Sequence, residues 1–168
     1  RLAAIPYPHS LGVFYSAVTK ALGFKPARHE GKITGLAALA TPPDALLEEV
    51  RGYAYSDKPG SFAVPSIYGH YPRIKRLAKK YGRENMAAAF QIVLEEVASA
   101  FVRHYVDAYA PIDVVLAGGV FANVKINQRL AELEGSRSLK MAARQTRRSE
   151  LRVIKAADIT LVVSTAEK

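Results

Sequence analysis

Ile112-Asp-Val-Val-Leu-Ala-Gly-Gly-Val-Phe-Ala-Asn123 is the stretch of sequence that decides the fold. Its first six residues are almost all apolar and follow Pro111, which predicts a buried strand. Two glycines come directly after the strand, and a helix is predicted from about Val120 to Leu133. A strand, a tight turn and a helix in this order are typical of an α/β sheet with helices packed across it.

The two glycines also give the turn a candidate chemical role. They let the backbone turn sharply and approach a ligand closely. Ligands of open α/β sheets bind beside the carboxyl ends of strands, where N–H groups at a helix start face an anion or a polar edge. Asn123, expected on the first helical turn, is a candidate partner for a ribose or a base. Taken alone, Gly118 and Gly119 are explained more simply by a plain tight turn, because they match neither the P-loop nor the dinucleotide fingerprint.

A second cluster is Arg28-His-Glu-Gly-Lys32, a polar loop ahead of a small-residue helix expected from Ile33. A lysine near a helix start can hold a phosphate, and a glutamate can accept from ribose hydroxyls. Glu30, Gly31 and Lys32 are therefore candidate ligand contacts. Taken alone, a solvated loop with a helix-capping Glu30 explains the cluster more simply.

Other helices are predicted from apolar spacing and capping residues. The clearest covers residues 84–109, whose wide apolar stripe indicates cover on more than one side. Residues 51–72, rich in Gly, Pro and Tyr, are expected to be irregular or a hairpin. The remaining helices are 11–22 between Ser10 and Gly23, 44–50 with Asp44 as cap, and 73–80 between Pro72 and Gly82.

Composition excludes several classes of protein. Nearly half of the 168 residues are apolar, enough for a sizeable core. There is no cysteine, which excludes disulfides and thiolate metal sites and fits a cytoplasmic location. Charges interrupt the apolar runs before the roughly 20 residues of a membrane helix, so no membrane association is expected. The formal charge is +9, and residues 136–168 carry eight Lys/Arg against three Asp/Glu.

Three stretches, in matching order and spacing, resemble signatures of the NodU/CmcH-type carbamoyltransferases. They cover residues 10–19, 22–38 and 115–129, and the likeness extends over roughly 6–135. The resemblance implies an incomplete actin-like ATPase (ASKHA) domain with a mixed sheet flanked by helices. It also implies an intact enzyme that uses ATP and carbamoyl phosphate to form a carbamoyl-adenylate. The acceptor is a hydroxyl of a sugar, an antibiotic or a similar small molecule.

The resemblance also implies site residues. The related tRNA threonylcarbamoyl transferase contacts its nucleoside through a Gly-Gly-Val-x-x-Asn stretch. By that match Gly118, Gly119 and Asn123 line a nucleoside site. Glu30, Gly31 and Lys32 would lie near the ribose and phosphates.

Two departures from the family pattern predict a fragment without activity of its own. The family holds a divalent metal, iron or magnesium, with a histidine pair and an aspartate in a Pro-His-x-Gly-Asp-Gly-Gly-like stretch, and neither is found here. The YrdC-like partner domain is also missing, and Arg1 in place of Met predicts a start further upstream. The scattered His9, His29, His70 and His104 form no close metal-ligand pair. No catalytic residue is assigned, and structural roles are expected for His9, His70 and His104.

The main rival is a basic nucleic-acid-binding protein, suggested by Arg73–Lys80 and Arg137–Arg152. Few aromatic residues interleave with these charges, which disfavours it. A tRNA-modification relative is an intermediate case. Its Gly-Glu-Ala-Phe-Asp-Lys signature is replaced here by Leu11-Gly-Val-Phe-Tyr-Ser16, which argues against it.

The resemblance stops abruptly after Gly135, which divides the chain into a family segment, 1–135, and an atypical basic tail, 136–168. A divergent native ending would still supply strands at 151–154 and 159–163. A shift of reading frame is favoured, because the change is sudden and coincides with the shift in charge. It predicts poorly packed or irregular structure over 136–150 and an exposed sheet edge that invites association.

Overall fold

The computed structural model describes residues 5–6, 8–65, 67–109 and 112–133, together with the backbone of strands 136–141 and 159–162. The helices are α1 (Leu11–Ala21), α2 (Glu30–Ala37), α3 (Asp44–Arg51), α4 (Tyr71–Tyr81), α5 (Arg83–Tyr109) and α6 (Val124–Ala131), with a 3-10 helix η1 (Gly119–Ala122). The strands are β1 (Ile112–Ala117), β2 (Ser136–Met141) and β3 (Ile159–Val162).

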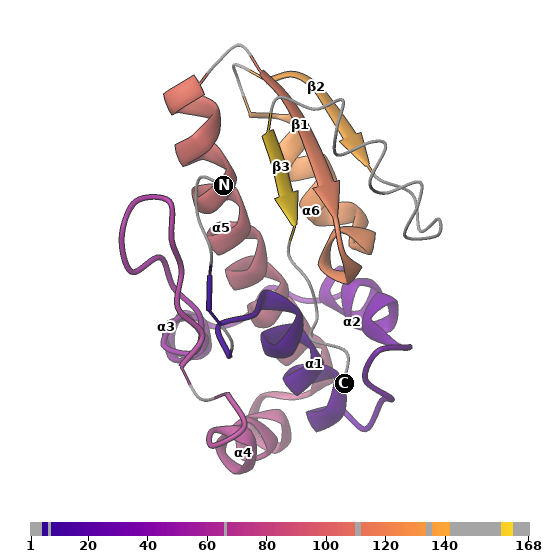
Figure 1. The fold of residues 1–168 in the computed structure, drawn as a ribbon. Coiled ribbons are helices and arrows are strands. Elements are labelled where there is room, and N and C mark those ends of the chain that lie inside the picture. Colours follow the sequence, from indigo (N-terminus) through magenta and orange to yellow (C-terminus); the bar gives the residue numbers. More distant parts are fainter. Residues whose placement is uncertain are drawn as a thin grey trace.

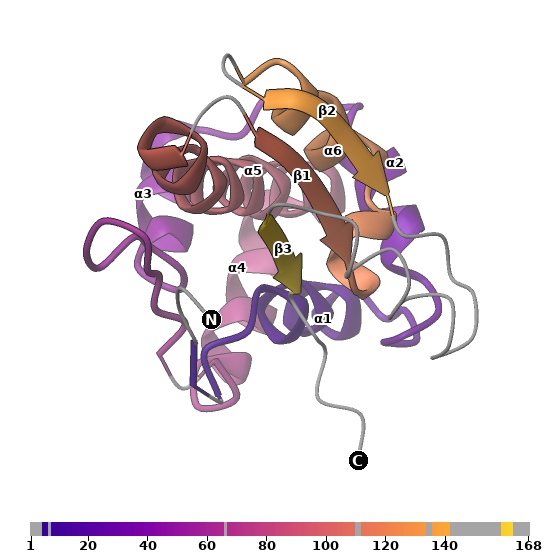
Figure 2. The ribbon, with the colours of Figure 1, turned by 45° about the horizontal axis from the view of Figure 1, so that its top comes forward.

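The described strands form one parallel sheet in the order β2-β1-β3, with β1 in the centre. Val114 of β1 pairs with Leu139 of β2 and with Ile159 of β3. The chain passes from β1 through η1 and α6 to β2, the kind of helical connection that a parallel pair requires. Figures 1 and 2 show the strands side by side, with β1 ending close to α1 and α2. The sheet therefore directs the carboxyl end of β1 toward these two helices.

Helix α5 is the centre of the core. Helices α1, α2, α3, α4 and α6 all pack against it. The ring of Phe90 is fully buried and stacks on Phe14 of α1, with the ring centroids 4.7 Å apart. By length and mean hydropathy, 1.3, this helix could cross a membrane, but 67% of that stretch is buried inside the protein. Its apolar stripe therefore serves as protein core in this fold.

The helices expected over residues 11–22, 73–80 and 84–109 are confirmed as α1, α4 and α5. Ser10 caps α1 by accepting a hydrogen bond from the Val13 N–H at 3.4 Å, and Gly23 follows α1 with a φ of 80°. Gly82, with a φ of 85°, separates α4 from α5. Both glycines adopt the left-handed conformation that favours glycine after a helix.

Some boundaries differ from the sequence-based expectation. Helix α2 begins at Glu30 instead of Ile33, and the Glu30 carboxylate accepts from the Ala27 N–H of the preceding loop at 2.7 Å. Asp44 is the first residue of α3 and makes no capping bond, since Pro43 occupies the cap position. Residues between α3 and α4 form a loop with a single antiparallel bridge, Tyr55 to Ala63.

The basic tail also differs in part. Poorly packed or irregular structure is expected over 136–150, and the irregular alternative is wrong for Ser136–Met141, which forms strand β2 and pairs in parallel with β1. The strand expected at 159–163 is confirmed as β3 over Ile159–Val162. Residues 142–158, which include the strand expected at 151–154, lie outside the described residues. Whether the tail is native or frame-shifted stays a prediction.

Candidate functional site

The turn after β1 brings the backbone to the surface between two buried segments. Val114–Ala117 are buried, Val120 and Phe121 are buried, and Gly118 and Gly119 between them are exposed. Gly118 has φ 106° and ψ 163°, a conformation that side-chain-bearing residues rarely adopt. The glycine pair thus makes an exposed, sharply bent backbone at the carboxyl end of a parallel strand. This is where open α/β sheets bind ligands.

Asn123 follows the turn and caps α6. Its Oδ1 accepts from the N–H groups of Lys125 at 3.1 Å and Ile126 at 3.4 Å. The helix expected from Val120 is therefore divided: η1 ends at Ala122, and α6 begins at Val124. The expectation that Asn123 lies on the first helical turn is wrong, because its side chain holds that turn from the preceding position.

The Asn123 amide also bonds to two other helices. Its Nδ2 donates to Gln91 Oε1 of α5 at 2.8 Å and to Thr34 Oγ1 of α2 at 3.2 Å. The Tyr15 hydroxyl of α1 donates to the same Gln91 oxygen at 2.5 Å and lies 3.2 Å from Thr34 Oγ1. Gln91 Nε2 donates to Glu95 at 2.6 Å. We call Tyr15, Thr34, Gln91 and Asn123 the amide network.

Burial raises the pKa of the Tyr15 hydroxyl far above its ordinary value, and the nearby charges of Glu95 and Glu30 raise it further. Hydrogen bonds to Thr34 and Asn123 act in the opposite direction and do not cancel the effect. Tyr15 therefore stays protonated at all ordinary pH values and serves the network as a neutral hydrogen-bond donor.

The second cluster is divided between two faces of α2. The Glu30 carboxylate accepts from the N–H of Ala27, which precedes α2, and, at 3.2 Å, from the Ser16 hydroxyl. It therefore holds the preceding loop and joins α2 to α1, without capping the helix. Lys32 turns another way and places its Nζ 5.4 Å from the centroid of the Phe24 ring. Arg83 lies over the same ring at 4.6 Å. Gly31 is exposed, with no atom within 4 Å of where a Cβ would stand.

The fold does bring the two clusters close together. Thr34, one helical turn after Glu30, bonds to Asn123 across 89 positions of sequence. Figure 1 shows α2 next to the segment that follows β1. Thr34 of the amide network follows the cluster by half a turn, whereas Lys32 lies beside the Phe24 ring. The geometry thus joins the start of α2 to the glycine turn.

Sequence reasoning missed Tyr15, Thr34 and Gln91. A signal was present, because Tyr15 and Gln91 are polar residues within the apolar faces of two predicted helices. Both are buried, with 4% and 5% of their surface exposed. Buried polar groups need hydrogen-bond partners, so each indicates a further polar residue nearby.

The histidines have structural partners. His9 Nδ1 accepts from the Val64 N–H at 3.0 Å. The ring of His70 lies 5.0 Å from that of Tyr53, and the ring of His104 lies 5.0 Å from that of Tyr105. Within the described part of the chain, no three His, Cys, Asp or Glu side chains are placed to hold a metal ion. The residues described here therefore do not fit the divalent metal that the resemblance implies.

A cleft of about 600 Å³ lies at the other end of β1. It is bounded by the N-terminal segment, the loop around Gly60 and the end of α5, and polar side chains from His9, Asp57 and His104 line it. Because α5 leads into the amino end of β1, this cleft is distant from the glycine turn. It is not part of the candidate site.

Comparisons with known proteins point to one family. A family model described as carbamoyltransferase N-terminus matches residues 2–137. The uncharacterised protein MJ1058 of Methanocaldococcus jannaschii is 29% identical over 128 residues, which is 73% of this chain and 21% of the relative. The uncharacterised protein sll1178 of Synechocystis is 31% identical over 146 residues, 75% of this chain and 23% of the relative. The chain thus spans less than a quarter of the length of these two relatives.

Proposed function

Because the chain belongs to the carbamoyltransferase N-terminus family, we propose that it is part of an O-carbamoyltransferase and carries part of its nucleotide site. The longer protein would use ATP and carbamoyl phosphate to form a carbamoyl-adenylate. In the transfer step, the oxygen of an acceptor hydroxyl forms a bond to the carbamoyl carbon, and the bond from that carbon to the phosphate oxygen of AMP breaks. AMP leaves with that electron pair, and the hydroxyl proton passes to solvent. The acceptor class is a sugar, an antibiotic or a similar small molecule, and the location is cytoplasmic.

One observation supports the nucleotide site above all others: the exposed Gly118-Gly119 backbone at the carboxyl end of β1. A backbone without side chains allows close approach of a ribose or phosphate. Asn123 ends the short η1 helix that follows this backbone, and its bond to Thr34 places α2 close by. Gly31, on the same helix, has open space around it. Lys32 would reach a phosphate of the ligand by turning away from the Phe24 ring, beside which its Nζ lies. An actin-like ATPase domain would contain such a site at this end of its sheet.

The remaining chemistry is assigned to parts of the longer protein. A YrdC-like domain would handle carbamoyl phosphate, and a divalent metal would be held by ligands outside the described residues. None of the described side chains is assigned a catalytic role. We therefore expect that the chain alone forms no carbamoyl-adenylate. Release of pyrophosphate from ATP and carbamoyl phosphate, dependent on this chain alone, would contradict that expectation.

The nucleotide site is tested by calorimetry of ATP binding to the full-length protein. We expect Gly119→Val to reduce ATP affinity by roughly tenfold or more, because the side chain occupies space that the ligand needs. Gly35→Ala is the matched control, since its added Cβ would contact no atom within 4 Å. Equal ATP affinity in the wild type and both variants would assign the glycine turn to packing alone.

A second candidate function, nucleic-acid binding, is favoured by one surface. Between Asp57 and Glu84 there is no acidic residue, and all six Lys/Arg of residues 73–83 are exposed. Few aromatic residues lie among these charges, as expected, but Tyr71 and Tyr81 flank the segment. Lys80 lies 4.7 Å from the Tyr81 ring, and Lys20 lies 5.0 Å from the Tyr71 ring. Single-strand binding surfaces combine positive charge with aromatic rings on which bases stack.

The two candidates are separated by one set of binding measurements. ATP, duplex DNA and tRNA are titrated against the protein at two salt concentrations. Nucleic-acid binding through α4 would be strong at low salt and would weaken steeply as salt rises. Arg76→Glu would then reduce tRNA binding and leave ATP binding unchanged. Absence of binding to both nucleic acids at low salt would exclude the second candidate.

A further inference from the structure

We propose that Gln91 is a positioning residue for the nucleotide site: it holds Asn123 in place and thereby fixes the Gly118-Gly119 turn. The inference rests on the proposed function only for the identity of the ligand. Gln91 lies on α5, the helix against which the other helices pack. Its backbone is therefore held firmly by the core, and its side chain can restrain a turn at the surface.

The contact between the two amides is reciprocal. Asn123 Nδ2 donates to Gln91 Oε1 at 2.8 Å, and Gln91 Nε2 lies 3.3 Å from Asn123 Oδ1 as a donor. The same Oδ1 caps α6. One side chain thus connects the start of α6 to the middle of α5. The turn lies immediately before this connection.

The orientation of the Gln91 amide is set by its other partners. Its oxygen faces the Tyr15 hydroxyl, which stays protonated and so can only donate usefully to it. Its nitrogen faces the Glu95 carboxylate at 2.6 Å. A flipped amide would place its NH₂ against the NH₂ of Asn123 and its oxygen against the Glu95 carboxylate, with the loss of both hydrogen bonds. A single orientation is therefore strongly preferred, and it presents an acceptor to Asn123.

The conformation of the Gly118-Gly119 turn depends on contacts with the surrounding structure. Gly118 has φ 106° and ψ 163°, and residues in sparsely populated conformations persist where the surrounding structure determines them. Asn123 is only half-buried, so its orientation depends on partners and not on enclosure. Loss of the Gln91 contact should loosen the turn without removing any group that touches a ligand. The expected effect is weaker nucleotide binding together with greater opening of η1.

Gln91→Glu tests this role because glutamate has nearly the same shape as glutamine but can gain or lose a proton. As a carboxylate, the introduced side chain still accepts from Tyr15 and Asn123 but repels the Glu95 carboxylate and donates nothing. Burial and the nearby Glu95 charge will raise the pKa of the introduced carboxyl, so that acidification restores a neutral group with one donor. We expect the full-length variant to bind ATP about tenfold more weakly than wild type at about pH 8. The difference should shrink toward about pH 5.5 as the carboxyl gains its proton.

Hydrogen exchange gives a second measurement that needs no nucleotide. In the Gln91→Glu variant, amides of residues 119–126 should exchange faster than in wild type at about pH 8 and approach wild-type protection at about pH 5.5. Gln128→Glu is the matched control, because Gln128 is exposed on α6. It should leave both measurements unchanged.

The outcomes separate the positioning role from the proposed function. Wild-type exchange over 119–126 in Gln91→Glu at about pH 8 would overturn the positioning role, whatever the nucleotide result. If wild type binds no ATP while the variant exchanges faster, the proposed function fails and the structural role of Gln91 stands. If Gln91→Glu does not fold, Tyr15→Phe replaces it, since it removes one donor to Gln91. Unchanged exchange over 119–126 in Tyr15→Phe would then overturn the inference.

Discussion

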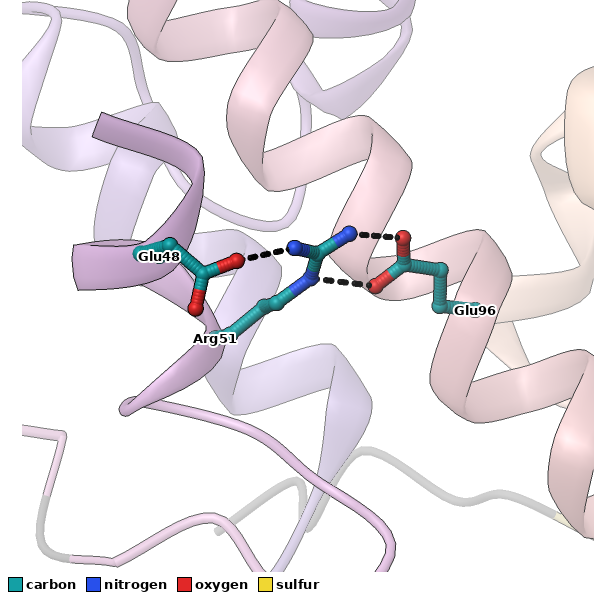
Figure 3. A network of polar contacts seen from close by, with 3 residues as sticks. All are labelled: Glu48, Arg51 and Glu96. Carbon is teal, nitrogen blue, oxygen red and sulfur yellow. Dashed lines mark hydrogen bonds and ion pairs between the residues drawn. The ribbon is translucent and has the colours of Figure 1, made fainter. Parts of the chain in front are cut away.

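The guanidinium of Arg51 on α3 holds the carboxylate of Glu96 on α5 with two hydrogen bonds (Figure 3). Arg51 Nε lies 3.1 Å from Glu96 Oε2, and Nη2 lies 2.7 Å from Oε1. Glu48, on the same helix as Arg51, contacts the remaining Nη1. Hydrogen bonds to Glu96 and then to Glu48 raise the pKa of Arg51 further above its ordinary value. The contact fixes α3 against the central helix at the protein surface.

Replacement of Arg51 should show how much the two hydrogen bonds to Glu96 contribute to the stability of the fold. Arg51→Lys keeps the charge but loses the paired hydrogen bonds, so we expect a lower unfolding temperature than wild type. Arg51→Ala should lower it further. A double-mutant cycle with Glu96→Ala measures the coupling, which should decrease at high salt because both side chains are partly exposed. Additive effects of the two single substitutions at low salt would show that the pair contributes nothing.

The lowered pKa of Glu49 predicts that the protein loses stability at acid pH. Burial opposes its ionisation, but hydrogen bonds from Tyr53 and Arg73, with the Arg73 charge, lower the pKa of Glu49 overall. A carboxylate whose folded pKa lies below its unfolded value stabilises the fold above the unfolded value. That contribution is lost as the pH falls through the folded pKa.

We therefore expect Glu49→Gln to flatten the pH dependence of the urea midpoint below about pH 4.5, the ordinary value for glutamate. Above that pH the variant should be less stable than wild type. The exposed Glu84 provides the control substitution, Glu84→Gln. A Glu49→Gln curve parallel to wild type between about pH 5 and pH 3 would contradict this prediction.

Substitution of alanine for glycine should change the stability of the protein in opposite directions at Gly118 and Gly31. Gly118→Ala forces a side chain into φ 106° and should destabilise the protein by about 1–3 kcal/mol. Gly31→Ala lies in α2 with open space around it and should stabilise the protein by about 0.4–1 kcal/mol. Urea unfolding measures both. If Gly31→Ala is stable but binds ATP more weakly in the full-length protein, the open space at Gly31 is used by the ligand.

The sequence predicted the elements whose signals are local. Apolar residues of strand β1, the two glycines after it and the long apolar stripe of α5 each specify their own structure over a short range. Ser10 and Gly23 marked the ends of α1 in the same way. The glycine turn was therefore identified as a candidate site before any tertiary contact was known. Its chemistry as a nucleotide site stays a prediction.

What the sequence did not predict depends on distant partners. Glu30 starts α2 early with help from Ser16, 14 positions away. The Tyr15 and Gln91 side chains meet across 76 positions, and no helical or strand period relates them. The apolar pattern of residues 120–133 predicts one continuous helix, but the structure has a break at Asn123. The side-chain amide of Asn123 is held there by α5 and α2. Each of these contacts arises from the packing of helices and not from local propensity.

Asn123 allows capping to be separated from the amide network. Asn123→Ala removes the cap of α6 and leaves Gln91 Oε1 with one donor fewer, so we expect a loss of about 1–2 kcal/mol in unfolding free energy. Asn123→Ser keeps an oxygen able to cap α6 but has no amide to reach Gln91. It should recover most of the stability.

ATP affinity of the full-length protein then distinguishes the two roles of Asn123. If the proposed site is correct, Asn123→Ala should weaken ATP binding by roughly 1–3 kcal/mol. Asn123→Ser should remain almost as weak, because a restored cap does not restore the link to α5. Recovery of ATP affinity in Asn123→Ser to the wild-type value would show that the cap alone supports the turn. Wild-type stability in Asn123→Ala would instead show that α6 does not depend on this cap.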